Sequence, residues 1–300
     1  MQKRNLIFIF NGGTMNGVFG AGVASALQEA NIYHKIESVY GISAGAHNAA
    51  FFLTKDAPRG STIYYEDLIE KKFIHKNKFG IFLRQLIFNA FKKQKIEHVI
   101  DIDYLINLEK TTKKLKVDLI NDSEINFFIK VFNLKKDKAE YLKGVENTLK
   151  KIQASSAIIP FYPKTVKIGE EIYADNDSLS NKFDNYLIKQ IELHQDKIFI
   201  LIFNKPINFR VYAKSIFSNF LWSILSALYL KKFSIIFNKN DILEYYKLKK
   251  ILKNPNVLYI ASDIDIHNLC DSKNELLNLY RHGIKKTEEF LLKNKIYEQI

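Results

Sequence analysis

The sequence predicts a three-layer α/β/α fold with a mostly parallel central sheet and helical embellishments. The first observation is the order of elements, in which apolar runs at 6–10 and 38–41 read as strands. Small-residue segments at about 17–30 and from about 43 onward read as helices. This βαβα order implies parallel strands joined by right-handed crossovers. The second observation is composition, because 300 residues with a 47% apolar fraction suffice for a large buried core.

Later segments extend this core. Apolar runs rich in β-branched or aromatic residues predict strands over 126–132 and 197–203. A short hairpin is expected over 168–173, with its turn at Gly169. The region from about 51 to 121 is lysine-rich and aromatic, and we expect it to be mainly helical and to form a cap or peripheral layer.

The chain is predicted to form one domain over 1–300, because no repeat or low-complexity linker divides it. We expect the catalytic core to span about 5–205 and a helical C-terminal extension to span about 206–300. Apolar residues at helical spacing predict a helix over 272–292 that packs on the outside of the sheet.

Composition and charge limit the classes of partner. A single cysteine, Cys270, excludes an internal disulfide, and no Cys/His set has the spacing of a structural zinc site, so no metal or other cofactor is expected. The run 6–10 is too short for a signal-peptide core, and these features together predict a cytoplasmic protein. The formal net charge is +13, but the lysines are scattered among acids, which argues against nucleic acid and is compatible with attraction to anionic lipid.

The segment 215–230 carries no charged side chain. It is shorter than the roughly 20 residues that a membrane-spanning helix requires. We expect a buried or lid helix. The alternative is an interfacial helix whose apolar side chains enter lipid, namely Phe217, Phe220, Leu221, Trp222 and Leu225.

A G-x-S-x-G pattern lies between a predicted strand and a predicted helix, with Ser43 between Gly41 and Gly45. A sharp strand-to-helix turn strains the serine backbone and presents its hydroxyl at the carboxyl edge of the sheet. The helix that follows directs unpaired amides, including that of Ala44, at the same point, which favours an oxyanion. Ser43 is therefore a candidate nucleophile. The alternative is a tight turn that merely caps a helix.

A glycine-rich loop, 11–22, follows the first strand and opens a helix. Its spacing fits neither a P-loop, because Gly17 is followed by Val18, nor a dinucleotide fingerprint. We expect the backbone amides of Gly12 and Gly13 to stabilise an anion beside Ser43. The alternative is that these glycines only make the turn.

These motifs resemble the patatin-like phospholipases, specifically their bacterial cytoplasmic branch. The family has a G-G-G-x-[RK]-G loop, then G-x-S-x-G, and later an Asp-Gly-[Gly/Ala] motif. The matching segments here are the loop 12–17 with Gly17 closing it, the elbow 41–45, the segment 154–160 and Asp175. The chain departs from the family pattern at four positions, which are Thr14, Asn16, Asn176 and Asp177.

The resemblance implies a serine lipid acyl hydrolase, similar to phospholipase A or lysophospholipase, that works through an acyl-enzyme. Its catalytic pair would be Ser43 and Asp175, with Asp177 as the rival acid. Its substrate would be a phospholipid or another acyl-ester lipid, and it could contact the inner membrane surface peripherally. The family uses no catalytic histidine, so we expect surface or core-edge positions for His47, His194, His267 and His282.

Three alternatives stay open at this point. A catalytically impaired member could bind lipid without turnover, because Thr14 and Asn16 alter the oxyanion loop. An ordinary α/β-hydrolase with a Ser-Asp-His triad would need one of the histidines to be essential. The acyl acceptor could also be another lipid in place of water.

Overall fold

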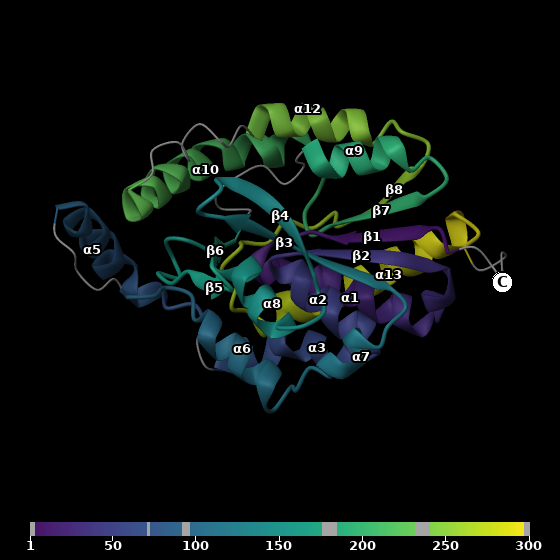
Figure 1. Cartoon of the computed structure of the whole chain (residues 1–300), viewed down its shortest axis with the longest axis horizontal. Coiled ribbons are helices and arrows are strands. Elements are labelled where there is room, and N and C mark those ends of the chain that lie inside the picture. Colours follow the sequence, from purple (N-terminus) through teal and green to yellow (C-terminus); the bar gives the residue numbers. More distant parts are fainter. Residues whose placement is uncertain (1–3, 71–72, 92–96, 176–184, 232–240, 297–300) are drawn as a thin grey trace.

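The computed structural model describes residues 4–70, 73–91, 97–175, 185–231 and 241–296. It confirms the three-layer α/β/α architecture, with one eight-stranded sheet between two layers of helices (Figure 1). The helices on one face are α9 (Asn185–Leu193), α10 (Phe209–Leu230) and α12 (Asp241–Ile251). The principal helices on the other face are α1 (Gly17–Glu29), α2 (Ala44–Leu53) and α13 (Lys273–Lys293).

The sheet is mostly parallel, as predicted, in the order β5-β6-β3-β2-β1-β7-β8, with β4 paired to β3. The parallel strands are β1 (Leu6–Phe10), β2 (Ile36–Ile42), β3 (Asn126–Asn133), β7 (Ile198–Phe203) and β8 (Val257–Ala261). The antiparallel additions are β4 (Lys138–Lys143), β5 (Val166–Ile168) and β6 (Glu171–Ala174). The strands expected from the sequence and the hairpin at Gly169 are confirmed, whereas β4 and β8 were not foreseen.

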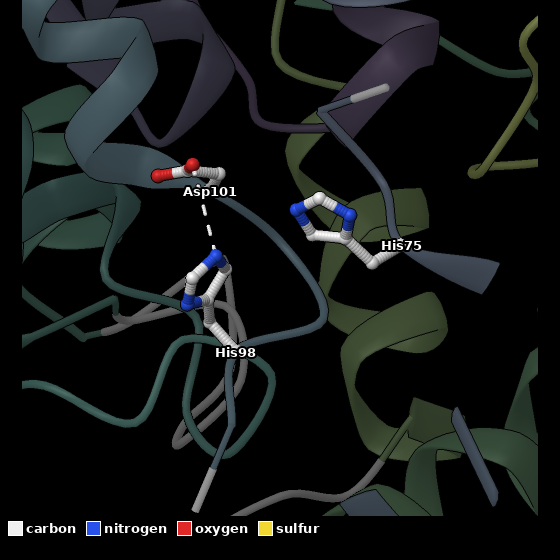
Figure 2. Close-up of side chains that lie close together, drawn as sticks. All are labelled: His75, His98 and Asp101. Carbon is white, nitrogen blue, oxygen red and sulfur yellow. Dashed lines mark ion pairs between the residues drawn. The ribbon is translucent and has the colours of Figure 1, made fainter. Parts of the chain in front are cut away.

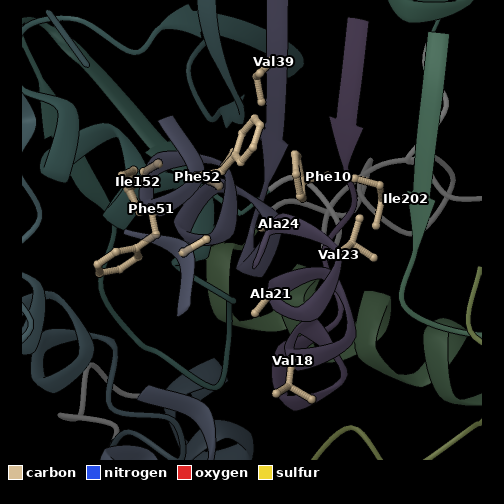
Figure 3. Close-up of a cluster of buried hydrophobic side chains, with 14 of the residues drawn as sticks. Phe10, Val18, Ala21, Val23, Ala24, Val39, Phe51, Phe52, Ile152 and Ile202 are labelled. Atoms are coloured by element: carbon tan, nitrogen blue, oxygen red, sulfur yellow. The ribbon is translucent and has the colours of Figure 1, made fainter. Parts of the chain in front are cut away.

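Alternation along the central strands places one large apolar core on each face of the sheet, and two smaller clusters lie beside them. Successive side chains of a strand point to opposite faces of its sheet. In β1, Phe8 and Phe10 accordingly pack toward α1 and α2, whereas Ile7 and Ile9 join the core beneath α9 and α12. Figure 3 shows the first of these cores, where Phe10 and Phe52 lie above α1. The β1 run is apolar throughout because both of its faces are covered.

The region predicted to be mainly helical forms a layer beside and beyond α2. Its α-helices are α3 (Ala57–Thr62), α4 (Leu68–Glu70), α5 (Phe79–Phe91), α6 (Ile102–Lys110) and α7 (Val117–Asn121). Between α3 and α4 lies the π-helical segment η3 (Ile63–Asp67). The helix α8 (Thr148–Ser156) packs against β3, and α5 projects from the body of the molecule (Figure 1).

The uncharged segment lies within α10, and it is neither wholly buried nor wholly interfacial. Leu225 is buried, and the Trp222 ring lies against Phe161 with 4.4 Å between ring centroids. Phe220 and Leu221 instead face outward, with 54% and 42% of their surfaces exposed. No helix of the described chain is long and apolar enough to cross a membrane.

The C-terminal helix α13 lies on the outside of the sheet, as predicted, where it contacts β8 and packs mainly against α1 of the same helical layer. The two helices cross at Gly22 and Gly283, whose Cα atoms lie close to one another. A Cβ atom on Gly283 would collide with the Phe19 carbonyl oxygen of α1. Glycine at this crossing therefore sets the distance between the two helices.

We predict that Gly283→Ala destabilises the protein despite the better helix propensity of alanine. The added methyl group meets backbone, which cannot rotate away, and overpacking of this kind costs about 1–3 kcal/mol. Gly80→Ala is the matched control, because a Cβ atom there meets nothing within 4 Å. Urea unfolding should show a loss of stability for Gly283→Ala and none for Gly80→Ala. Equal stability of the two variants would contradict the close packing of α1 on α13.

Candidate functional site

Ser43 occupies the sharp turn between β2 and α2, with φ 51° and ψ −125°. This is the strained backbone that the G-x-S-x-G pattern predicts, and positive φ is costly for a residue with a side chain. The turn is tight because α2 begins directly against the ends of β1 and β2. A Cβ atom on Gly45 would collide with the Phe10 carbonyl oxygen, and one on Gly41 would lie 2.5 Å from the Ala46 Cα.

Strand pairing brings the chain after β2 and the chain after β6 to one point. Ile42 at the end of β2 pairs with Lys130 of β3, and Ala174 at the end of β6 pairs with Phe132. Because β4 occupies the opposite edge of β3, β2 and β6 lie on the same edge and run toward each other. Ser43 directly follows β2 and Asp175 directly follows β6, so the two residues approach the Val131 position of β3 from opposite directions.

The end of α8 contacts both segments. The Ser155 hydroxyl accepts a hydrogen bond from the Ser43 amide (2.8 Å) and donates one to the Lys130 carbonyl (2.7 Å). Two residues later, the Ala157 carbonyl accepts a bond from the Asp175 amide (3.1 Å). All these residues lie in the interior, with Ser43 4% and Asp175 1% exposed. The segment 154–160, singled out from the sequence, thus anchors the backbone of both candidate catalytic residues.

Asn204, directly after β7, holds the glycine-rich loop. Its side-chain amide donates to the carbonyls of Asn11 (2.7 Å) and Gly12 (3.0 Å), and its oxygen accepts from the Gly20 amide (2.9 Å). In a trans peptide the N–H points away from the carbonyl. The amides of Gly12 and Gly13 are therefore turned away from Asn204, and within the described residues neither has a hydrogen-bond partner.

Two of the four residues that depart from the family pattern, Thr14 and Asn16, belong to the glycine-rich loop. Thr14 adopts φ 50°, a left-handed conformation that glycine would take more readily. Asn16 is fully buried, and its amide donates to the Asn268 side chain (2.9 Å) and the Ile266 carbonyl (3.2 Å). Asn16 therefore ties the loop to the segment before α13. Asn176 and Asp177 lie outside the described residues.

Gly17 at the end of the loop is anchored to α2. Its carbonyl accepts a hydrogen bond from the Asn48 side chain (2.8 Å), whose oxygen accepts one from the Tyr64 hydroxyl (3.1 Å). Burial, together with the Glu109 carboxylate, raises the pKa of Tyr64 above its ordinary value. Tyr64 thus keeps its proton and remains a hydrogen-bond donor.

A cavity that is partly open to solvent adjoins Ser43, and its empty volume, including the open part, is about 490 Å³. Ser43 and Ala44 lie at its wall together with Thr14 and Met15 from the loop. Most of the remaining wall is apolar and comes from the helical layer, and these residues are Phe51, Ile63, Leu68, Phe73, Ile102, Leu105 and Ile158. A long apolar group fits such surroundings.

His47 lines the same cavity, which corrects the expectation that it faces away at the surface or core edge. Its Nδ1 lies 2.6 Å from Glu109 Oε1, and its Nε2 lies 2.7 Å from the Ser156 hydroxyl. Exposure is 4% for His47, 0% for Glu109 and 3% for Ser156. Both ring nitrogens are thereby engaged, so His47 is not placed to activate Ser43. The expectation was wrong because the side of α2 that carries His47, one helical turn after Ser43, faces α6 and α8 and not solvent.

The other three histidines considered from the sequence do not line the Ser43 cavity. His194 is exposed and its Nε2 lies 3.2 Å from the Gln190 side-chain oxygen, and His267 is also exposed. His282 packs on the Phe19 ring at the core edge, as expected. Asn204 was missed in the sequence, although an asparagine directly after an apolar strand is a signal that could have identified it.

A family of known sequences and a solved structure resemble this chain. The sequence model of a family described as patatin-like phospholipase matches residues 8–175, which include the loop, the elbow and Asp175. A search of curated proteins gives no match. Among solved structures, the crystal structure of VipD from Legionella pneumophila is similar over 97% of this chain and 67% of that chain, with 15% identity and a TM-score of 0.45.

Proposed function

Because the chain belongs to the patatin-like phospholipase family, we propose that it is a serine lipid acyl hydrolase that uses Ser43 and Asp175 as a catalytic dyad. The family acts on lipid substrates, and the finer assignment is an activity like that of phospholipase A or lysophospholipase. The observation that carries the proposal is the convergence of β2 and β6 on one edge of β3. It supports a serine and a carboxylate at a common point, and Ser43 also lines the apolar cavity.

The proposed reaction has two steps. The hydroxyl oxygen of Ser43 attacks the ester carbonyl while Asp175 takes the hydroxyl proton. The amides of Gly12, Gly13 and Ala44 stabilise the resulting oxyanion. The intermediate collapses, the alcohol leaves with that proton, and the acyl group stays on Ser43. Water then attacks the acyl-enzyme with the same proton transfers, which releases the fatty acid and restores the serine.

Three features support the individual roles. The Gly12 and Gly13 amides face away from Asn204, and the Ala44 amide is the first of α2, where helix N–H groups have no partner in the helix. The apolar cavity wall suits a fatty acyl chain. The bonds of His47 to Glu109 and Ser156 disfavour a Ser-Asp-His triad at Ser43.

Labelling with a fluorophosphonate tests the proposal, because the reagent reacts only with an activated serine. The wild-type protein should be labelled at Ser43 and should release fatty acid from a phospholipid panel, and Ser43→Ala should remain unlabelled. Absence of labelling in the folded wild type would overturn the enzyme assignment and favour a lipid-binding member without turnover. That alternative depends on Thr14, whose backbone is left-handed, and on Asn16, which binds the Asn268 side chain.

We also propose peripheral contact with an anionic membrane through the outer side of α10. Phe220 and Leu221 are exposed there, and Ile81 of the neighbouring helix α5 is 52% exposed. Apolar side chains of this kind enter the headgroup region, and the net charge of +13 adds attraction to acidic lipid.

For this contact we predict that Phe220→Ser with Leu221→Ser lowers binding to anionic vesicles by about tenfold or more, since each apolar side chain contributes about 1.5–3 kcal/mol when fully buried. Vesicle co-sedimentation measures the effect. Leu292→Ser is the matched control, because Leu292 is 71% exposed but lies on α13 in the opposite layer. Equal binding of the α10 variant and the wild type would contradict the proposed contact.

A further inference from the structure

Two histidines and an aspartate converge at the outer edge of the helical layer, away from Ser43. They are His75, before the 3₁₀ turn η4 (Lys76–Lys78), His98, and Asp101 at the start of α6. One ligand atom from each lies within 4.8 Å of the other two. Figure 2 shows that both rings point a nitrogen toward the Asp101 carboxylate. The spacing in the sequence gave no sign of this set, because the residues come from two separate segments.

Backbone hydrogen bonds hold these two segments together. Ile74 and Ile100 form an isolated antiparallel bridge. Beside it, the His75 amide donates to the Val99 carbonyl (2.8 Å), and the Asp101 amide donates to the Phe73 carbonyl (3.0 Å). The bases of all three side chains are therefore fixed relative to one another by main-chain structure.

The Asp101 carboxylate is oriented by its role as the N-cap of α6. Its Oδ1 accepts a hydrogen bond from the Tyr104 amide (3.0 Å), and its Oδ2 lies 3.7 Å from His98 Nε2. The side chains of His98 and Asp101 are 37% and 31% exposed, so an ion from solvent has access. The second oxygen of the capped carboxylate therefore faces the His98 ring, so that one ion could contact both side chains.

We propose that His75, His98 and Asp101 bind a divalent transition-metal ion, with zinc as the best fit and water as the fourth ligand. Two imidazoles with one carboxylate suit zinc, whereas calcium and magnesium prefer sets made of oxygen atoms. Zinc bonds of about 2.0–2.1 Å place tetrahedral ligand atoms roughly 3.3 Å apart. The ligand atoms, which lie within 4.8 Å of one another, would have to draw closer to this spacing when the ion binds.

The site adjoins the approach to the Ser43 cavity. His75 also lines a second, open pocket whose wall includes Met15, Leu68 and Phe73, and these three residues also line the Ser43 cavity. A bound zinc ion would fasten 73–75 to 98–101 and so stabilise the outer wall of that approach. The ion plays no part in the proposed acyl transfer, so the metal site can be tested independently of the proposed catalytic dyad.

Isothermal titration of the EDTA-treated full chain with zinc chloride tests the site. One ion should bind per chain, and His75→Ala, His98→Ala and Asp101→Ala should each raise the Kd by about tenfold or more. His194→Ala is the matched control, because His194 is an exposed histidine directly after α9, and it should leave the Kd unchanged. Cys270→Ser should also bind zinc as the wild type does, because Cys270, which lines the second pocket, is not part of the proposed set.

Cobalt gives an independent readout. Co²⁺ in place of zinc should show the visible absorption of a tetrahedral site, and His98→Ala should abolish it while circular dichroism shows the fold retained. Wild-type affinity for zinc in the folded His98→Ala variant would overturn the proposal. So would loss of zinc binding in Cys270→Ser or His194→Ala alone.

Discussion

Ser43→Ala and Asp175→Asn are each expected to lower kcat on a short acyl ester by about 1000-fold or more, while the protein stays folded. In the proposed dyad the serine is a poor nucleophile until the carboxylate takes its proton, so either change removes the same step. Asparagine has nearly the shape of aspartate but cannot accept the proton. Steady-state hydrolysis, with unfolding curves of the same preparations, measures both effects.

The double variant makes this prediction specific to a pair that acts as a unit. Ser43→Ala with Asp175→Asn should be no slower than either single variant, because effects within a catalytic unit are not additive. Asp177→Asn is the matched control from the same short segment, and it should keep most of the activity. A loss with Asp177→Asn as large as that with Asp175→Asn would transfer the role of base to the rival acid.

The second large effect concerns stability, and it comes from the buried set of His47, Glu109 and Ser156. His47→Leu should lower the free energy of unfolding by about 3 kcal/mol or more. The change removes the ring nitrogen that lies 2.6 Å from Glu109 Oε1, and a carboxyl group that is 0% exposed and has lost its partner is strongly destabilising. Urea unfolding monitored by circular dichroism measures the change.

A double substitution distinguishes the effect of leaving Glu109 without its partner from the effect of losing packing at residue 47. His47→Leu combined with Glu109→Leu should recover part of the stability, because no buried carboxyl group then remains. At low temperature, where His47→Leu is still folded, its kcat should fall far less than that of Ser43→Ala. A 1000-fold loss in the folded variant would show that His47 acts in catalysis, as the triad hypothesis requires.

The strands and the elbow were predictable because their signals are local. A strand that is covered on both faces, such as 6–10, is apolar at every position, and such a run is visible in the sequence. The G-x-S-x-G pattern is also read from neighbouring residues, because the strand before it and the helix after it give it its chemical meaning. The edge strand β4 escaped prediction because its sequence is lysine-rich, as is usual where an edge faces solvent. β8 is a short run in a polar context, and only its pairing with β7 makes it a strand.

The missed parts of the site depend on contacts between distant residues. His47, Glu109 and Ser156 come from three helices, and no spacing in the chain predicts that they meet. The same holds for Asn204, which bonds to a loop nearly two hundred residues earlier. Conversely, the family motifs located Ser43, Asp175 and the loop without any knowledge of these supports.

The position of β7 decides how far the molecule can be shortened. The family match ends at residue 175, yet β1 lies between β2 and β7 in the middle of the sheet. A fragment cut at residue 175 would keep every residue of the proposed chemistry but would leave β1 with one bare, hydrogen-bonding edge. It would also release the loop that Asn204 clamps, so the smallest autonomous unit must continue at least past Asn204.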